Sequence, residues 1–235
     1  MLESGLLDTG PASEFEVERI PLHEHRPEDP RVAAPVSARG SLESLREAAA
    51  RCKACPLWHG ATQTVFGEGD PHASLLILGE QPGHNEDLSG RPFVGPAGLL
   101  FEKTLKLAGL DRESVYVTNA VKHFKWELRG KRRLHKTPVQ REIEACNPWL
   151  DAELDLVKPR AVLCLGATAA RAMLGGPVRV GEHRGHPIES PKGYQVVVTV
   201  HPAYILRLRA GEAEAALAML TADVELAARL ARAGS

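Results

Sequence analysis

The sequence predicts an α/β fold built on a central, largely parallel four-stranded sheet. Four short runs are almost continuously apolar, as expected of strands that are buried on both faces; they cover residues 74–79, 114–121, 161–166 and 194–202. Segments with helical spacing of apolar residues lie between and after these runs. Strands that alternate with helices in this way form parallel sheets, so the alternation sets the fold class.

Helices are expected in five segments. The first begins at Ser41, a residue type that caps helix N-termini, and ends near Cys52. The others cover residues 95–110, 137–157, 167–176 and 212–234. Residues 1–40 are rich in proline and acidic residues and have no sustained apolar period, which predicts a flexible N-terminal extension. Residues 41–235 are then expected to form a single domain.

The composition is that of a globular protein that works in water. Hydrophobic residues make up 43% and charged residues 25% of the chain, which is ordinary for this class. No apolar run approaches the roughly 20 residues that span a bilayer, and no basic start with an apolar block marks a secretory signal. We therefore expect a cytoplasmic monomer without membrane contact.

One stretch is strongly basic although the formal net charge is only −1. Residues 122–136 read KHFKWELRGKRRLHK, where seven lysines and arginines accompany the single acid Glu127. Contact with nucleic acid would therefore come from this local patch. Taken alone, the patch is equally consistent with a solvated basic loop that happens to contain His135.

Polar motifs gather where the expected strands end. GEQPG follows the first strand, TNAVKHFK overlaps the end of the second, LGATAA closes the third, and HPAYILR ends the fourth. Ligands of open α/β sheets bind at the carboxyl ends of the strands. The common location of these motifs predicts a single site at that edge.

The four cysteines are Cys52, Cys55, Cys146 and Cys164. The first two form a C-x-x-C pair, and structural disulfides are not expected in an intracellular chain. Four thiolates suit either a zinc ion or an iron–sulfur cluster, and their spacing leaves both open. Cys164 also fits as a small core residue.

Taken together, these motifs resemble the uracil-DNA glycosylase superfamily, and most closely its iron–sulfur branch. The resemblance covers residues 45–210 and is carried by VFGEG (65–69), GEQPGHNEDLSGRPFVGPAG (79–98), TNAVKHFK (118–125), CNPWL (146–150), LGATAA (165–170), RG (184–185) and HPAYILR (201–207). GEQPG together with KRRLHKTP is similar to the UdgX subfamily, whose members cross-link to uracil-containing DNA through a loop histidine. The resemblance implies a three-layer α/β/α sandwich.

The same resemblance implies a cofactor and a uracil pocket. A four-iron four-sulfur cluster would be held by Cys52, Cys55, Cys146 and Cys164, which fall on the family's ligand positions. The implied substrate-binding residues are Gln81, Asp87, Phe93 and Asn119, with Phe93 stacking on the base and Asn119 reading its edge. By residue type alone, a core position is favoured for Phe93, and a capping role is slightly favoured for Asn119.

Three residues are implied to be catalytic. His201 would hydrogen-bond the charge that develops on departing uracil. His135 would then add to the sugar carbon C1′, and Glu80 would accept the remaining imidazole proton, which leaves a persistent adduct. Ala203 and His84 depart from the residues usual at their positions in the family. Phosphate contacts are expected from Lys131, Arg132, Arg133, Lys136 and Arg184, and Arg133 is also expected to position the loop.

The sequence therefore predicts a DNA-repair protein that excises uracil, prefers single-stranded DNA as its partner, and ends as a covalent complex through His135. One alternative is an ordinary uracil-DNA glycosylase that turns over, in which His135 only contacts DNA. A second is a non-catalytic iron–sulfur module that binds DNA.

Overall fold

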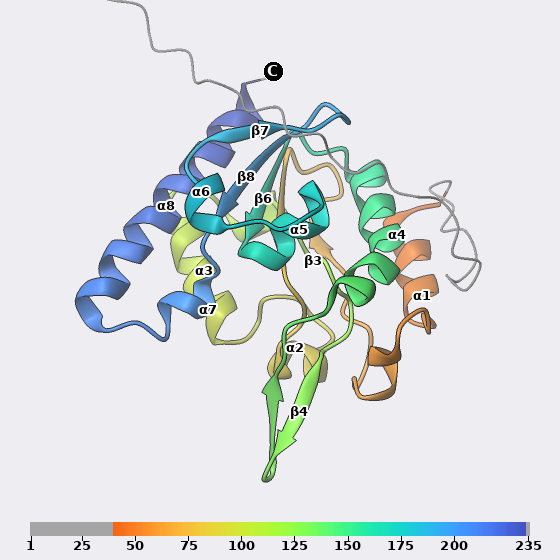
Figure 1. Cartoon of the computed structure of the whole chain (residues 1–235). Coiled ribbons are helices and arrows are strands. Elements are labelled where there is room, and N and C mark those ends of the chain that lie inside the picture. The colour runs from red at the N-terminus through yellow and green to blue at the C-terminus, as the bar shows by residue number, and fades with distance from the viewer. Residues whose placement is uncertain (1–39, 234–235) are drawn as a thin grey trace, which may run out of the picture.

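The structure, a computed structural model, describes residues 40–233 of the chain. A central sheet is covered by helices on both faces, as expected for a three-layer α/β/α sandwich (Figure 1). The predicted N-terminal extension, except for Gly40, lies outside the described residues. No helix within this described part is long and apolar enough to cross a membrane.

The central sheet has six strands in the order β1-β3-β2-β6-β8-β7. The four predicted strands form its parallel centre; they are β3 (Tyr116–Asn119), β2 (Leu75–Gly79), β6 (Ala161–Leu165) and β8 (Gln195–Thr199). The predicted number of strands was wrong, because β1 (Glu68–Gly69) and β7 (Pro187–Glu189) add antiparallel edges. These edges are only two and three residues long, too short for a hydrophobic pattern to reveal them.

All five predicted helices are present, and they divide between the two faces of the sheet. The bounds are α1 (Leu42–Ala49), α3 (Pro96–Leu107), α4 (Gln140–Val157), α5 (Ala167–Leu174) and α8 (Ala210–Arg232). Leu76 and Leu78 of β2 pack toward α1, α4 and α5, whereas Leu75 and Ile77 pack toward α3 and α8. Successive strand residues point to opposite faces, so a run that is apolar at every position fits a sheet covered on both sides.

Shorter elements connect these layers. They are the helices α2 (His84–Ser89), α6 (Val180–His183) and α7 (Pro202–Ile205) and the 3₁₀ turns η1 (Pro56–His59) and η2 (Arg112–Ser114). Helix α2 follows the GEQPG motif and α7 follows the His-Pro motif, so both begin at the carboxyl edge of the sheet.

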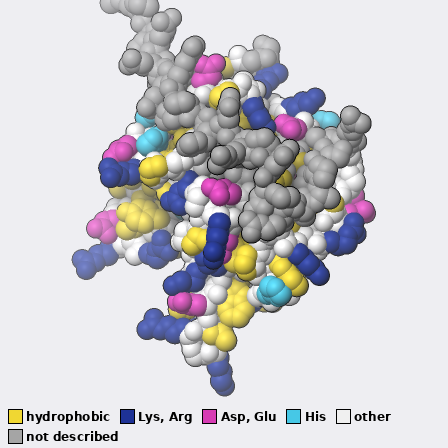
Figure 2. Space-filling model, turned by 45° about the vertical axis from the view of Figure 1, so that its right-hand side comes forward, with side chains coloured by type: hydrophobic (Ala, Val, Ile, Leu, Met, Phe, Trp, Pro, Cys, Tyr) yellow, Lys and Arg dark blue, Asp and Glu magenta, His cyan; other side chains and the backbone are white. Residues whose placement is uncertain are grey.

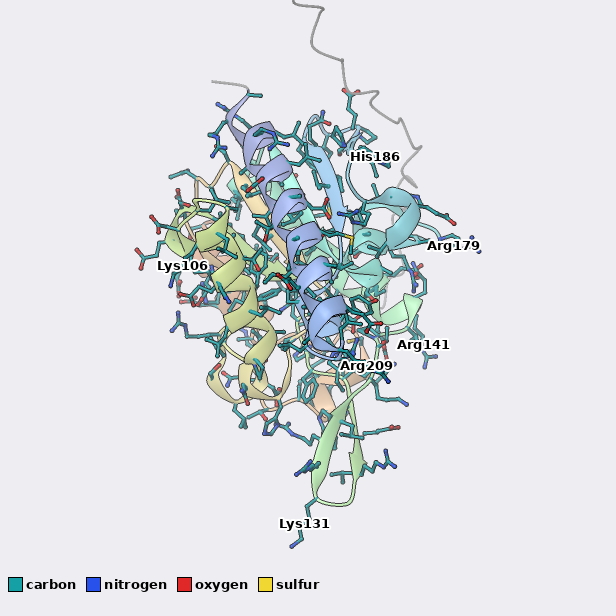
Figure 3. The ribbon with its side chains drawn as sticks, turned by 90° about the vertical axis from the view of Figure 1, so that its left-hand side faces the viewer. Lys106, Lys131, Arg141, Arg179, His186 and Arg209 are labelled. Carbon is teal, nitrogen blue, oxygen red and sulfur yellow. The ribbon has the colours of Figure 1, made fainter. Side chains whose placement is uncertain are left out.

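The basic segment is a β-hairpin, which corrects the expectation of a loop. Strands β4 (Trp126–Arg129) and β5 (Arg132–His135) pair antiparallel, with Trp126 opposite His135, and Gly130 takes the left-handed φ of 62° in the turn. The hairpin projects from the body of the molecule (Figure 1), and Lys131 at its tip points away from the fold (Figure 3). The register places His135 at the base of the hairpin, next to the sheet.

Candidate functional site

The carboxyl edge of the sheet brings together residues that are far apart in the sequence. Glu80 directly follows β2, Asn119 is the last residue of β3, and His201 comes two residues after β8. Thr168, which the sequence reasoning missed, lies in the first turn of α5 after β6. Because β3, β2, β6 and β8 are parallel neighbours, these side chains lie along one edge.

Side chains from separate segments converge around Gly79, the last residue of β2. A Cβ atom at this position would lie 2.3 Å from Asn119 Oδ1 and 2.6 Å from Phe93 Cζ, so only glycine allows these two side chains to meet here. Phe93 itself has a positive φ of 58°, which is strained for a residue with a side chain. Its ring centroid lies 6.4 Å from that of His201. Phe93 therefore faces the site and is not a simple core residue.

His201 is held as a neutral hydrogen-bond donor. Burial lowers its pKa to about 4, and the nearby His135 and Arg207 lower it in the same direction. The backbone N–H of Ala203 donates to His201 Nδ1 at 3.1 Å. Since one nitrogen of a neutral imidazole accepts and the other carries the proton, Nε2 is the nitrogen with the hydrogen. That nitrogen is available to donate to an oxygen that develops negative charge.

His135 and Glu80 face each other at the carboxyl edge of the sheet. His135 Nε2 lies 3.4 Å from Glu80 Oε1, and the side chains are 48% and 19% exposed. Thr168 donates to the other carboxylate oxygen of Glu80 at 2.5 Å, which fixes the direction in which that carboxylate points. Burial lowers the pKa of His135, with Glu80 opposing that effect. The imidazole is therefore reachable from solvent, favours its neutral form, and has a proton acceptor beside it.

Gln81 holds the hairpin in this position. Its side-chain amide donates to the backbone carbonyls of Lys125 and Lys136, both at 3.1 Å, and accepts from Lys125 N at 3.0 Å. These two residues flank the hairpin, so Gln81 fastens both of its strands at their base. Gln81 was expected to bind substrate, but both of its N–H groups are already used inside the protein.

Asp87 and Arg133 form a second attachment of the hairpin. Asp87 is fully buried and accepts from Arg133 Nη1 at 2.7 Å and from the Thr62 side chain at 2.6 Å. The Arg133 guanidinium also lies 5.4 Å from the ring centroids of Phe124 and Trp126. The sequence assigned Asp87 to substrate, and it assigned Arg133 both to DNA and to positioning of the loop. In the structure the two side chains bind each other and fix β5 to α2.

The other cations predicted to bind DNA differ in their availability. Lys131 and Arg132 are exposed at the end of the hairpin, and Lys136 forms a half-exposed ion pair with Glu127 at 3.1 Å. Figure 2 shows Lys and Arg side chains gathered along this projecting end. Arg184 is different, because it binds Asp223 of α8 at 2.9 Å and is only 25% exposed. The hairpin therefore carries the accessible cations.

The four predicted cysteine ligands are all buried. Burial raises the pKa of Cys146 to about 12, and among the smaller influences Cys55 and Cys52 raise it further. Burial likewise raises the pKa of Cys55, with Cys52 adding to the effect. For Cys164 burial is the one cause of its raised pKa. Trp149 of α4 donates its Nε1–H to Cys52 Sγ at 3.2 Å, so Cys52 lies beside the helix that carries Cys146, whereas Cys164 lies in β6, between β2 and β8.

His123 is a buried residue beside these thiols that the sequence reasoning missed. Thr64 donates its hydroxyl proton to Ala49 O near the end of α1, so His123 Nε2, 2.9 Å from the same hydroxyl, is the donor in that contact. His123 Nδ1 is then an unprotonated nitrogen, and it has no hydrogen-bond partner among residues 40–233. The preceding residue, Lys122, donates its backbone N–H to Cys146 Sγ at 3.3 Å. Only this unsatisfied nitrogen singles out His123.

These groups suit a cluster better than a single ion. Within the described part of the chain, no three His, Cys, Asp or Glu side chains converge closely enough to bind one metal ion. In a four-iron cluster each ligand binds a different iron, so the ligands stand further apart. The buried thiols and the unpaired His123 Nδ1 are donors of the kind that would hold such a cluster.

Comparisons with known proteins found a matching family, several relatives and a similar solved structure. The family model described as Uracil DNA glycosylase superfamily matches residues 66–225. The chain is 38% identical to the type-4 uracil-DNA glycosylase of Thermotoga maritima over 73% of this chain and 86% of that protein. It is 36% identical to the type-4 uracil-DNA glycosylase of Pyrobaculum aerophilum over 76% and 92% of the two chains. The crystal structure of wild-type SMUG2 from Pedobacter heparinus has a similar fold, with a TM-score of 0.51 at 13% identity over 67% of this chain and 77% of that chain.

Proposed function

Since the chain belongs to the uracil DNA glycosylase superfamily, we propose that it excises uracil from DNA and that the reaction ends in a covalent bond between His135 and the sugar carbon C1′. The activity is the one named for its type-4 relatives. The observation that carries the covalent step is the pair of His135 and Glu80, 3.4 Å apart at the mouth of the pocket. The His135 side chain is 48% exposed, so its imidazole can reach a sugar that arrives from solvent, whereas the imidazole of a buried histidine could not.

Recognition begins with the base outside the helix stack, because its glycosidic bond is otherwise inaccessible. Uracil would stack on Phe93, while the amide of Asn119 pairs with its edge as both donor and acceptor. This pairing discriminates against cytosine, since a misaligned donor or acceptor in a buried site costs about 1–3 kcal/mol. The contact between Phe93, Gly79 and Asn119 supports this role.

The bond between C1′ and the uracil nitrogen then breaks, and uracil leaves with the electron pair. His201 Nε2–H donates to the oxygen on which the negative charge develops, and the sugar gains oxocarbenium character. The electron pair of a neutral His135 nitrogen bonds to C1′, which produces an imidazolium. Glu80 accepts the remaining N–H proton, so the product is a neutral N-alkylimidazole, a poor leaving group. This proton transfer explains why the adduct would persist.

The hairpin would deliver His135 and bind the strand at the same time. Exposed Lys131, Arg132 and Lys136 offer positive charge for sequence-independent phosphate contacts. We propose single-stranded DNA as the preferred partner of a monomeric protein, because a base in a single strand is extruded without breaking a pair. Arg184 is not included, since its guanidinium is bound to Asp223.

A denaturing gel tests this function. The protein is incubated with a single-stranded oligonucleotide that contains one uracil, with a thymine-containing oligonucleotide of the same sequence as the control. We expect a band near the summed masses for the uracil strand and none for thymine. Abasic product with many turnovers and no such band would instead support an ordinary glycosylase. The absence of both adduct and uracil release would support the non-catalytic module.

We also propose that a four-iron four-sulfur cluster is held by Cys52, Cys55, Cys146 and His123, with His123 in place of the expected Cys164. Three observations support this set: the contact of Lys122 N with Cys146 Sγ at 3.3 Å, the contact of Trp149 Nε1 with Cys52 Sγ at 3.2 Å, and the unpaired His123 Nδ1. When bound, the cluster would supply a structural tie between the end of α1 and helix α4. Cys164 is then a core residue of β6.

Iron content distinguishes the two candidate ligands. In anaerobically purified protein, Cys164→Ala should retain about four irons per chain and the broad visible absorption of the cluster, whereas His123→Ala should lose iron, because one of four ligands is missing. Cys146→Ala is the positive control for iron loss, because Cys146 belongs to both candidate ligand sets. Iron loss in Cys164→Ala with full retention in His123→Ala would return the fourth position to Cys164.

A further inference from the structure

We propose that Lys122 and Glu153 are positioning residues that set the orientation of Asn119 and connect it to helix α4. This inference rests on the proposed excision of uracil and extends it to a buried pair that touches neither the base nor the sugar. Lys122 follows β3 by three residues, and Glu153 lies on α4. Their side chains are 1% and 0% exposed.

The Lys122 ammonium uses all three of its N–H groups inside the protein. It donates to Glu153 Oε2 at 2.5 Å, to Thr118 Oγ1 at 2.7 Å and to the backbone carbonyl of Asn119 at 2.7 Å. The last two acceptors are the final residues of β3. The ammonium therefore holds the chain at the point where Asn119 leaves the strand.

Both carboxylate oxygens of Glu153 also accept hydrogen bonds inside the protein. Its Oε1 accepts from the Tyr116 hydroxyl at 2.9 Å and from Gly67 N at 3.1 Å, and Thr118 Oγ1 donates to both carboxylate oxygens. The Glu153 carboxylate therefore binds three parts of the protein at once: strand β3, Gly67 just before β1, and the Lys122 ammonium. A buried ion pair of this kind adds little net stability compared with apolar residues, so its geometry is the feature to explain.

The hydrogen bond from Lys122 to the Asn119 carbonyl connects the ion pair to the residue whose side-chain amide is proposed to pair with uracil. The Asn119 side chain lies so close to Gly79 that a single added carbon would clash with its Oδ1 at 2.3 Å. A rotation of the Asn119 backbone would move this amide relative to Gly79 and Phe93. Because Lys122 Nζ fixes the Asn119 carbonyl, the ammonium controls the direction in which the amide meets uracil.

The same pair connects the pocket to the proposed cluster region. Glu153 lies seven residues after Cys146 on α4, about two helical turns. The backbone N–H of Lys122 donates to Cys146 Sγ, while its side chain binds Glu153. One helix therefore holds both ends of Lys122, and a displacement of α4 would be transmitted to Asn119.

The test compares three variants, Glu153→Gln, Lys122→Met and the double variant Lys122→Met/Glu153→Gln. Lys122→Met leaves a buried carboxylate without its cation and is expected to lower the melting temperature strongly. The double variant removes both charges, so its melting temperature should recover toward that of the unmodified protein. Asp155→Asn is the matched control, because this exposed carboxylate lies on the same helix and contacts Lys192.

Two kinetic quantities separate positioning from stability. One is the single-turnover rate constant of uracil release at saturating protein, and the other is the concentration of thymine-containing single strand that halves this rate. In the double variant we expect the rate constant to fall about tenfold or more, the size of one misaligned buried hydrogen bond. The competing strand should remain as effective, because the hairpin cations that bind it are unchanged. Iron content is measured alongside to confirm that the cluster is retained.

A stable double variant with the rate constant of the unmodified protein would overturn the positioning role. A parallel loss of rate and of competition by the thymine strand would also contradict it, since that pattern indicates general damage. If the unmodified protein releases no uracil, the proposed function fails first, and this result is distinct from an effect confined to the variants.

Discussion

Replacement of His135 by serine is expected to abolish the covalent band while uracil release continues. Phe93, Asn119 and His201 make the pocket, and none of them depends on the His135 side chain for its position. Without the imidazole, the sugar carbon would be open to water at the mouth of the pocket, next to Glu80. The protein would then behave as a hydrolase, with an abasic strand as its product.

The measurement for His135→Ser is the denaturing gel with the uracil strand, run before and after alkaline cleavage of abasic sites. His72→Ser is the matched control, because this exposed histidine lies in a turn before β2, away from the carboxyl edge. The control should form the adduct in full. An undiminished adduct in His135→Ser would assign the nucleophile to another residue.

Glu80→Gln is expected to slow adduct formation by about 10²-fold or more, within the range usual for loss of a general acid–base group. Glutamine can still accept the hydrogen bond from Thr168, but it cannot take the proton that His135 must lose after it bonds to C1′. The imidazolium would then leave again. A rise in pH should partly restore the rate, because hydroxide can remove that proton instead.

Rapid-quench kinetics under single-turnover conditions would measure this rate for Glu80→Gln. The matched control is Glu102→Gln, an exposed carboxylate on α3 that pairs with Lys106 at 2.8 Å. Its rate should equal that of the unmodified protein. If Glu80→Gln forms the adduct at the normal rate, the proton must leave by another path and the proposed role of Glu80 is wrong.

The central sheet could be predicted from the sequence because its strands are buried on both faces. Burial on both sides makes each strand a continuous apolar run, and the polar motif after each run then falls at one edge. The motifs that contain Glu80, Asn119 and His201 were located in this way, and the resemblance to the family implied the roles of the three residues. The structure brings them to the same edge. The approximate bounds of the five long helices followed from apolar spacing and from their capping and glycine residues.

The hairpin, the partner of Arg133 and the unpaired nitrogen of His123 could not be predicted, because they depend on tertiary contacts that leave no local pattern in the sequence. The basic segment alternates apolar and polar residues only over Trp126–Arg129, too briefly to predict a hairpin, and Gln81 and Asp87 bind the hairpin from elsewhere in the chain. Residue type also could not reveal that Arg133 would bind a buried carboxylate while Lys131 stays exposed. His123 shows the same limit, since only the three-dimensional surroundings identify its unpaired nitrogen.

The assembly of the site from separate strand ends has a consequence for folding kinetics. Glu80, Asn119, Thr168 and His201 come from four parallel strands, and each neighbouring pair of strands closes a long loop. Such non-local pairing forms slowly, and the pocket is incomplete until the last parallel strand has docked. With the uracil strand in excess, the yield of adduct should therefore equal the fraction of molecules that are fully folded. During refolding, this yield should rise at the rate of the slowest phase seen by tryptophan fluorescence.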